Sequence, residues 1–207
     1  MPRDDPANSI DRAAAAATSR DRATLTALVT GDPDARVRAI ALATLVGHLP
    51  SSISAPVWRA AVHDTDARVR RRAAEVAPKL GRAAPCGVLV GLLADDDAWV
   101  AEAAAYALGE HPRPTRTAIA ALVGAATTHP DPLVREAAVA ALGALGDPTT
   151  LPAVLAACDD KPAIRRRAVL ALAAFAGNEV EARLSAACTD PDWQVRQAAE
   201  DLLAGSE

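Results

Sequence analysis

Residues 32–41 read DPDARVRAIA, and closely related stretches follow along the chain. They are DTDARVRRRA (64–73), DDDAWVAEAA (95–104), HPDPLVREAA (129–138), DDKPAIRRRA (159–168) and DPDWQVRQAA (190–199). Each stretch holds one aliphatic anchor, and the anchors recur every 30 to 34 residues, at Val37, Val69, Val100, Val134, Ile164 and Val195. A period in this range is typical of stacked helical repeats. The repeat therefore predicts the fold, whereas clues to function must come from positions that depart from it.

The composition favours an all-α protein. The 207 residues are 51% hydrophobic but only 2% aromatic, and about a quarter of them are alanine. Alanine is the best helix former and allows helices to approach closely, so thin and tightly stacked helices are expected. The net charge of −4 and the pI near 5.6 argue against a surface that grips nucleic acid along its whole length.

The chain also shows no sign of export or membrane insertion. Its first twelve residues, MPRDDPANSIDR, lack the basic start and apolar stretch of a secretory signal. The longest apolar run is too short to span a bilayer. Three cysteines without CxxC spacing, Cys86, Cys158 and Cys188, are expected to be reduced thiols. These features predict a cytoplasmic protein.

Each repeat is expected to contain two helices. An aspartate three residues before most anchors can cap the helix that follows, and prolines end the helix before the turn. Small or apolar residues at +4 and +8 from each anchor form one buried helical face. A second apolar helix precedes each turn, over residues 22–29, 55–62, 85–93, 117–126, 149–157 and 179–187.

The expected architecture is therefore a single α-solenoid domain over residues 1–207. Six antiparallel helix pairs occupy residues 20–204, and a tail covers 205–207. Residues 1–19 are expected to form an N-terminal cap with a helix over 9–18, because the terminal repeats of such arrays must shield their open face.

The pattern D-x-D-x-x-V-R-x-x-A-A-x-A-L-G resembles HEAT repeats, especially the short form found in phycobilin-lyase-like proteins. The resemblance covers residues 20–204 and implies a right-handed superhelix of the armadillo/HEAT type. It is specific for the fold but not for function, because the same solenoid serves many unrelated tasks.

An aspartate five residues before the anchor and an arginine one residue after it recur in most repeats. In HEAT-like repeats such residues typically link neighbouring turns as a ladder of hydrogen bonds and ion pairs. A catalytic residue is needed once, whereas these recur, so a structural role is expected. His129 and Ala101 interrupt the two series. The expected ladder residues are Asp32, Arg38, Asp64, Arg70, Asp95, Arg135, Asp159, Arg165, Asp190 and Arg196.

Two arginine triplets add cations beyond the ladder. At +2 and +3 from the anchor these side chains should line the concave surface, where they would suit carboxylate or phosphate ligands. Alternatively, they belong to a solvated face that nearby acids such as Glu75 and Asp160 balance. The added residues are Arg71, Arg72, Arg166 and Arg167.

Acidic residues lie between the two triplets. Glu102 and Glu136 occupy the +2 position in the third and fourth repeats, so the concave face should run basic, acidic, acidic, basic. Such alternation suits a protein or peptide partner better than a uniform polyanion such as DNA. Trp99 and Trp193 lie in turns, where they either anchor a partner or shield the adjacent turn. Trp58 is expected in the core.

No residues suggest a catalytic or metal site. The four histidines share no i, i+3 or i, i+4 spacing, and no HExxH, phosphate loop or GxSxG motif is present. The sequence therefore predicts no cofactor and no metal. It favours a non-catalytic protein whose oligomeric state is open.

The leading hypothesis is a scaffold or adaptor that binds a partner protein in its concave groove. Two alternatives follow from the resemblance. One is a bilin-lyase-like subunit acting on a tetrapyrrole-carrying partner, which a co-purified chromophore would favour. The other is a DNA-glycosylase-like solenoid, which salt-sensitive DNA retention would favour; the acidic pI departs from that pattern.

Overall fold

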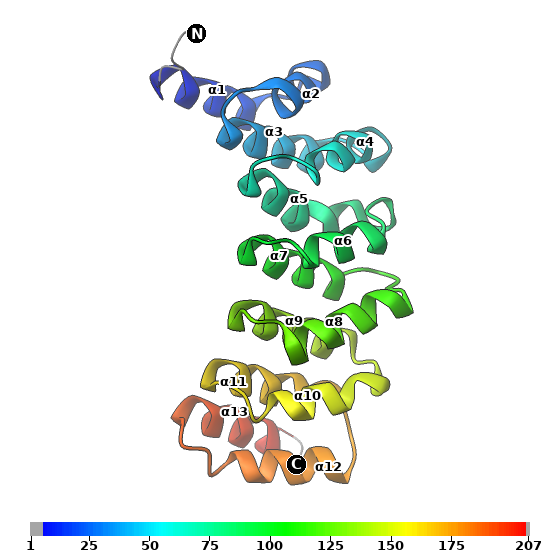
Figure 1. Cartoon of the computed structure of the whole chain (residues 1–207), viewed down its shortest axis with the longest axis vertical. Helices are drawn as coiled ribbons and strands as arrows, with labels where there is room; N and C mark the ends of the chain where they lie inside the picture. The colour runs from blue at the N-terminus through cyan, green and yellow to red at the C-terminus, as the bar shows by residue number, and fades with distance from the viewer. Residues whose placement is uncertain (1–5, 206–207) are drawn as a thin grey trace. The chain divides into compact units, whose positions relative to one another are not determined.

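A computed structural model of the chain describes residues 6–205 (Figure 1). The ends of the expected cap and tail, residues 1–5 and 206–207, lie outside the described residues. Residues 6–205 form thirteen α-helices and three short 3₁₀ helices and contain no strand. Over the same residues, no helix combines the length and apolarity needed to cross a bilayer. The prediction of an all-α solenoid of paired helices is confirmed.

Helix α1 precedes the pairs, and from α2 onward the first and the second helix of each pair alternate along the chain. The first seven are α1 (Pro6–Thr18), α2 (Arg22–Gly31), α3 (Ala35–His48), α4 (Ser51–Ala61), α5 (Ala67–Leu80), α6 (Cys86–Leu93) and α7 (Ala98–Gly109). The other six are α8 (Arg116–Thr128), α9 (Pro132–Leu145), α10 (Leu151–Ala157), α11 (Pro162–Ala171), α12 (Asn178–Ala187) and α13 (Trp193–Ala204). The 3₁₀ helices are Gly81–Ala83, Pro148–Thr150 and Leu172–Ala174.

The chain divides into two compact units. Unit 1 comprises the chain up to Ala107 together with His111–Arg113, and unit 2 comprises Leu108–Glu110 and the chain from Pro114 onward. The division falls in the last turn of α7, so the units are described one at a time.

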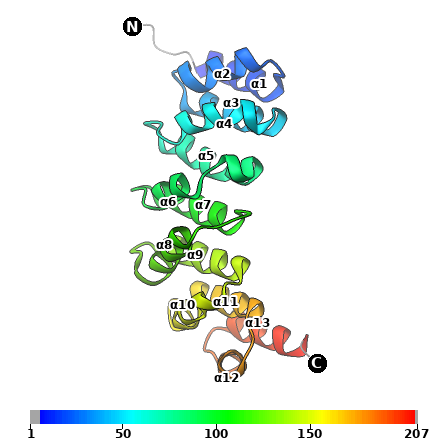
Figure 2. The same cartoon turned by 90° about the vertical axis from the view of Figure 1, so that its right-hand side faces the viewer.

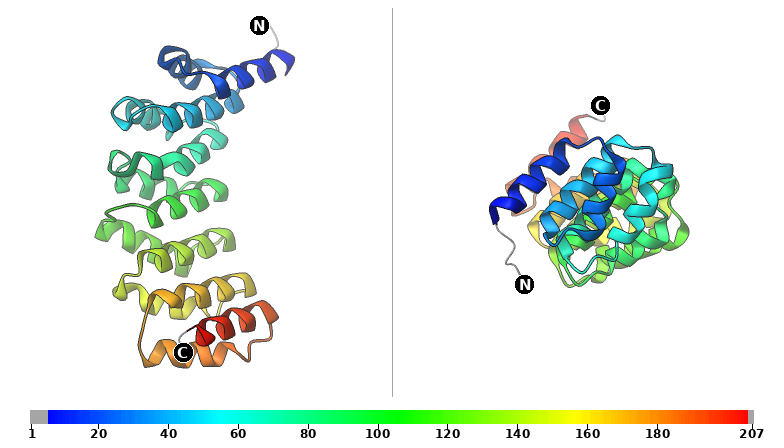
Figure 3. Two further views of the ribbon diagram at one scale, coloured as in Figure 1. Left: turned by 180° about the vertical axis from the view of Figure 1, so that it is seen from behind. Right: turned by 90° about the horizontal axis from the view of Figure 1, so that it is seen from above.

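Unit 1 is built on the second helices α3, α5 and α7. Helix α3 packs against α2, α4 and α5, and α5 in turn packs against α4 and α6. Helix α1, dark blue in Figure 3, packs against α3 and more lightly against α2. The cap helix therefore takes the place that the second helix of a preceding repeat would occupy.

Unit 2 repeats this arrangement. Helix α9 packs against α8, α10 and α11, while α13 packs against α11 and α12 (Figure 2). Helices α9 and α11 approach so closely that a Cβ added to Gly143 would lie 2.6 Å from the Cβ of Ala171. Glycine is therefore required at this crossing by the neighbouring backbone rather than by its own φ angle.

The aspartate caps explain where the second helices begin. Asp34, Asp66, Asp131 and Asp192 each have an extended backbone, and each side chain accepts a hydrogen bond from the backbone N–H two residues later. Satisfying these free N–H groups is worth roughly 1 kcal/mol per helix. Helix α11 lacks such a cap: Lys161 precedes it, and Pro162 starts it.

The anchors of the repeat form the core. All six, from Val37 to Val195, are buried together with the small residues that follow them. Trp58 is fully buried, as expected, and its Nε1–H donates to the carbonyl of Ala73 at 2.7 Å. The core is otherwise alanine, leucine and valine, which leaves the remaining aromatic side chains to be explained.

Candidate partner-binding surface

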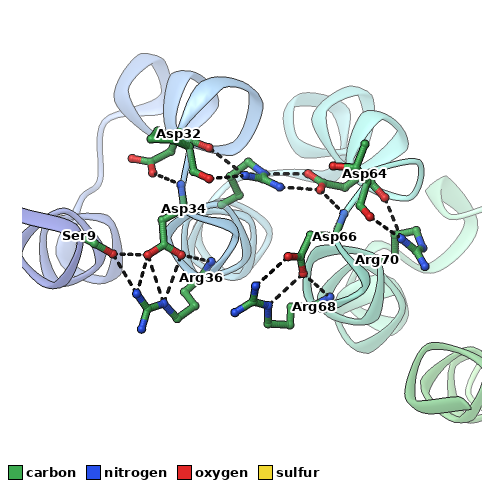
Figure 4. A network of polar contacts seen from close by, with 11 residues as sticks. Ser9, Asp32, Asp34, Arg36, Asp64, Asp66, Arg68 and Arg70 are labelled. Carbon is green, nitrogen blue, oxygen red and sulfur yellow. Dashed lines mark hydrogen bonds and ion pairs between the residues drawn. The ribbon is translucent and has the colours of Figure 1, made fainter. Parts of the chain in front are cut away.

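The ladder arginines of unit 1, Arg38 and Arg70, each join two turns. Figure 4 shows Asp32, Asp64 and Arg70 of this ladder. Arg38 donates from Nε and Nη2 to Asp64, at 2.8 and 2.7 Å, and from Nη1 to the carbonyl of Asp32 at 2.9 Å. Arg70 makes the same three contacts with Asp95 and with the carbonyl of Asp64. Bidentate, charge-assisted bonds of this kind fix geometry as well as contributing energy. The ladder thus connects each turn to the next within this unit.

Unit 2 has a ladder of its own. Arg165 donates to both carboxylate oxygens of Asp190, at 2.8 and 2.7 Å, and Arg135 does the same to Asp160 at 2.7 and 3.0 Å. The hydrogen bonds from Arg165 and Arg135 lower the pKa of these two carboxyl groups despite their partial burial. Within residues 6–205, Arg196 donates to two carbonyls, those of Asp190 and Pro191, and to no carboxylate.

The ladder acid of the fifth turn differs from the expected one. Asp159 was expected in the ladder, but Asp160 takes that place, because this turn has one residue fewer between the ladder acid and the anchor. Arg165 accordingly reaches back five residues, to the carbonyl of Asp160, whereas Arg38 and Arg70 reach back six. Asp159 is exposed instead and forms an ion pair with Arg183.

The N-terminal end of the ladder includes a residue that sequence reasoning missed. Arg12 of α1 donates to Asp32 from Nε at 2.8 Å and from Nη2 at 3.2 Å. The Asp32 side chain is only 3% exposed, so the arginine compensates a carboxylate that water hardly reaches. Asp11 precedes Arg12 where the other ladder arginines follow an aliphatic anchor, and the sequence therefore offered no register by which to find Arg12.

A second row of arginines lies at the outer edge of the same turns (Figure 4). Arg36 and Arg68 are exposed and pair with the capping residues Asp34 and Asp66, at 2.7 and 2.8 Å. The hydrogen bond from Arg68 lowers the pKa of Asp66 to about 2. Arg36 and Arg68 border a shallow cleft of about 640 Å³ that Ser9 and Thr65 also line. Each of these cations is neutralised within its own turn, so the cleft offers little charge to a ligand.

The two residues that interrupt the ladder series, Ala101 and His129, have structural positions. Ala101 is fully buried in α7. His129 replaces the turn aspartate, and its Nδ1 accepts the backbone N–H of Asp131 at 3.1 Å, as the aspartates do in other turns. The carbonyl of His129 accepts from Arg135 at 2.8 Å. His129 is therefore a turn residue rather than a metal ligand.

On the exposed face of α5, two of the predicted binding residues share one acid. The Nε of Arg71 lies 2.8 Å from Oε1 of Glu75, and Nη1 of Arg72 lies 2.8 Å from Oε2 of the same carboxylate. Lys79, one turn further along, is exposed. The guanidinium of Arg71 also lies over the Trp99 ring, 5.1 Å from its centroid. Such stacking stabilises by about 0.5–1 kcal/mol at an exposed site.

The adjoining face of α7 carries two exposed aromatic rings, on Trp99 (55% exposed) and Tyr106 (54%). Glu102 lies between them, half-buried, and makes no ion pair within the part of the chain that the structure describes. The spacing i, i+3, i+7 places all three on one side of the helix. Tyr106 was missed by sequence reasoning, although its seven-residue distance from Trp99 was the available signal. We call Trp99, Glu102 and Tyr106 the aromatic stripe.

Unit 2 carries the other predicted residues. Arg167 lies 3.5 Å from Glu136, which balances it, while Arg166 is exposed beside it. Asp160 neutralises neither Arg166 nor Arg167, because it is bound by Arg135. Between α9 and α11 a shallow groove of about 350 Å³ is lined by alanines, by Gly143 and Arg167, and by the partly exposed Leu170. Trp193 is 64% exposed at the start of α13.

The thiols and the remaining histidines form no built chemical site. Cys86 Sγ lies 3.4 Å from Nδ1 of His111, which also accepts the Arg113 N–H, while its Nε2 faces the Ala84 carbonyl at 3.2 Å. These contacts tie the start of α6 to the loop after α7. Burial raises the pKa of the Cys158 thiol. Within residues 6–205, no three His, Cys, Asp or Glu side chains are grouped to hold a metal ion.

A family model described as HEAT repeats matches residues 22–109, 88–167 and 119–204. The chain belongs to the HEAT-repeat family. No curated protein sequence matches it. Several solved structures do, at identities that show the fold alone.

Three structures illustrate the range of these matches. YibA of Escherichia coli is 16% identical with a TM-score of 0.69, covering 94% of this HEAT-repeat chain and 82% of its own. The complex of CpcE and CpcF of phycocyanin lyase from Nostoc sp. PCC7120 is 23% identical with a TM-score of 0.64, covering 89% and 76%. A designed armadillo repeat protein in complex with the peptide (KR)4 is 17% identical with a TM-score of 0.61, covering 91% and 100%.

Proposed function

We propose that this HEAT-repeat protein is a non-catalytic scaffold that binds a partner protein or peptide on the exposed faces of its second helices. The observation that carries the proposal is the aromatic stripe on α7. The chain has only five aromatic residues, and Trp99, Tyr106 and Trp193 are each more than half exposed. Tryptophan and tyrosine dominate the energetic centres of protein interfaces.

The surroundings of the stripe support this role. Arg71 is held over Trp99 and against Glu75, so a large side chain and a cation are already fixed before a partner arrives. Less conformational entropy is then lost on binding, because the participating rotamers are already restricted. In unit 2, Leu170, Arg166 and Trp193 supply a second exposed set, and Glu136 pairs with Arg167 at its border.

The neighbours are consistent with peptide binding by this architecture. One designed armadillo relative is described in complex with a peptide. The similarity to the phycocyanin lyase subunits, at 23% identity, concerns the fold alone. DNA binding is disfavoured by the net charge of −4 and by the acids that neutralise most arginines.

Site-specific photocrosslinking tests the proposal. A photoreactive phenylalanine analogue at Tyr106 should crosslink a partner in host cells, whereas the same analogue at the exposed Arg59 of the first helix α4 should not. The crosslinked protein is then identified, purified and titrated against wild type and the double variant Trp99→Ala, Tyr106→Ala.

The double variant should keep its helical circular dichroism and bind at least tenfold more weakly, since removing interface aromatics typically costs about 2 kcal/mol or more each. Equal affinity of wild type and double variant would contradict the proposal. Equal crosslinking from residues 106 and 59 would contradict it as well.

A further inference from the structure

The exposed face of α5 carries more cations than the acids around it neutralise. Arg71, Arg72 and Lys79 lie on the same side of the helix with Glu75, which is the carboxylate that both arginines contact. Glu102 of the aromatic stripe makes no ion pair with them within residues 6–205. Sharing one carboxylate leaves each guanidinium with donors to spare.

A comparison between the units shows why Arg72 lacks a partner of its own. Arg167, at the same repeat position in α11, reaches back to Glu136 on the preceding second helix at 3.5 Å. The residue of α3 equivalent to Glu136 is Ala39, so Arg72 has no acid there and turns to Glu75 instead.

The surface of α3 that faces this cluster is also uncharged. Ala39 and Ala43 lie on that side, and Gly47 is close enough to the end of Lys79 that an added Cβ would lie 4.0 Å from Nζ. Arg72 and Lys79 therefore lie between an apolar strip on α3 and the aromatic stripe on α7. A ligand that complements this arrangement needs negative charge flanked by apolar side chains.

We infer that the partner segment bound by unit 1 is acidic and apolar. Its carboxylates would contact Arg72 and Lys79, and its apolar side chains would cover Trp99 and Tyr106. This inference rests on the proposed function and adds the chemistry of the partner. A guanidinium binds carboxylate bidentately, and the low-polarity rings beside it strengthen the pairing by excluding water.

The probe for testing this inference is a short fluorescein-labelled peptide in which glutamate and leucine alternate. Two matched peptides carry glutamine or lysine in place of every glutamate. Binding is followed by fluorescence anisotropy with the whole chain and by the ¹H–¹⁵N signal of the Trp99 indole, which the variant Trp99→Phe assigns. The glutamate peptide should bind most tightly and shift the Trp99 signal but not that of the buried Trp58.

Four variants separate the charges. Arg72→Gln should weaken binding of the glutamate peptide about fivefold, the effect of losing one exposed charge pair. Glu75→Gln should tighten binding of the glutamate peptide by a factor of about three, because the carboxylate that competes with the peptide for Arg71 and Arg72 is removed. Ala39→Glu should weaken it by giving Arg72 an internal acid, as Glu136 does for Arg167. The control Arg59→Gln, at an exposed position of the first helix α4, should leave it unchanged.

The outcomes distinguish the inference from the proposed function. Preference for the lysine peptide with a shift of the Trp99 signal would overturn the acidic partner while leaving the stripe as a binding surface. Weaker binding of the glutamate peptide by Glu75→Gln would also overturn the inference, since it would mean that Glu75 supports the binding instead of competing with the peptide for the arginines. If none of the three peptides shifts the Trp99 signal, the inference fails, and the crosslinking experiment decides the proposed function on its own. Melting temperatures of all variants check that they fold, and a destabilised Ala39→Glu is replaced by Lys79→Gln, which should also weaken binding.

Discussion

Arg165 holds the carboxylate of Asp190 through two hydrogen bonds, of 2.8 Å from Nε and 2.7 Å from Nη2, while its Nη1 donates to the carbonyl of Asp160 at 3.0 Å. Both charged side chains are less than a fifth exposed. One guanidinium thus donates to three acceptor oxygens on two residues, and these oxygens would otherwise need other partners in a place with little water. The ladder is therefore expected to contribute to stability more than surface ion pairs do.

Replacing Arg165 with Ala should lower the free energy of unfolding by about 1–3 kcal/mol, because a poorly hydrated carboxylate and a carbonyl lose a charged donor. Urea denaturation followed by circular dichroism measures the change. Arg166→Ala is the matched control, since its exposed side chain should be worth about 0–1 kcal/mol at most. Equal effects of the two substitutions would contradict a structural role for the ladder.

The register of the fifth turn makes a second prediction. Asp160→Asn should destabilise the protein, because Arg135 would lose a bidentate carboxylate, whereas Asp159→Asn should change stability by less than about 1 kcal/mol. The Asp159 side chain is 74% exposed, so its pair with Arg183 is largely hydrated. Melting temperatures of the two variants test this directly. A larger loss for Asp159→Asn would mean that the turn has the longer register.

Two glycines should respond with opposite signs. Gly143→Ala should destabilise by about 1–3 kcal/mol, since the new Cβ would lie 2.6 Å from Ala171 Cβ and 2.9 Å from its Cα. Gly124→Ala, in the middle of α8, meets nothing within 4 Å and should stabilise by about 0.5–1 kcal/mol. Chemical denaturation of both variants gives the comparison. Stabilisation by Gly143→Ala would show that α9 and α11 are further apart than described.

The ladder also predicts acid sensitivity. Hydrogen bonds from arginine lower the pKa of Asp95, Asp160 and Asp190, and Arg68 lowers that of Asp66 to about 2. A carboxyl group with a depressed folded-state pKa stabilises the fold above its unfolded pKa of about 4 and loses that contribution as the pH falls. Stability should therefore decline from about pH 4 towards pH 2.

Urea denaturation across this pH range measures the decline. Asp160→Asn provides the control, because it removes one titrating group and should make the decline shallower. A constant free energy of unfolding between pH 5 and about pH 2 would rule out this coupling.

The parts of the structure that recur could be predicted from the sequence, and those that occur once could not. The anchors, the aspartate caps and most ladder residues repeat with a fixed spacing, so each copy supports the interpretation of the others. Asp160 was missed because a single deletion in a turn shifts the register without changing the residue type. Arg12 was missed because Asp11, rather than an aliphatic anchor, precedes it. Tyr106 was missed because it does not recur from repeat to repeat, so that only its seven-residue distance from Trp99 indicated that the two rings share a helix face.

The contact between Arg12 and the nearly inaccessible Asp32 has a consequence for how such arrays can be divided or lengthened. Arg38, Arg70, Arg135 and Arg165 each bind an acid in the turn before the next second helix, so an energetically complete building block does not coincide with one helix pair. It extends from a second helix through the following first helix to the next aspartate turn. A fragment that ends before Asp32 would lack the acid that Arg12 binds. A fragment that lacks α1 would leave the nearly inaccessible Asp32 carboxylate without Arg12. Grafting or duplicating modules of this protein should therefore succeed when the junction lies in an aspartate turn, between its acid and the next ladder arginine. It should fail when the junction separates a second helix from the aspartate turn that follows the next first helix.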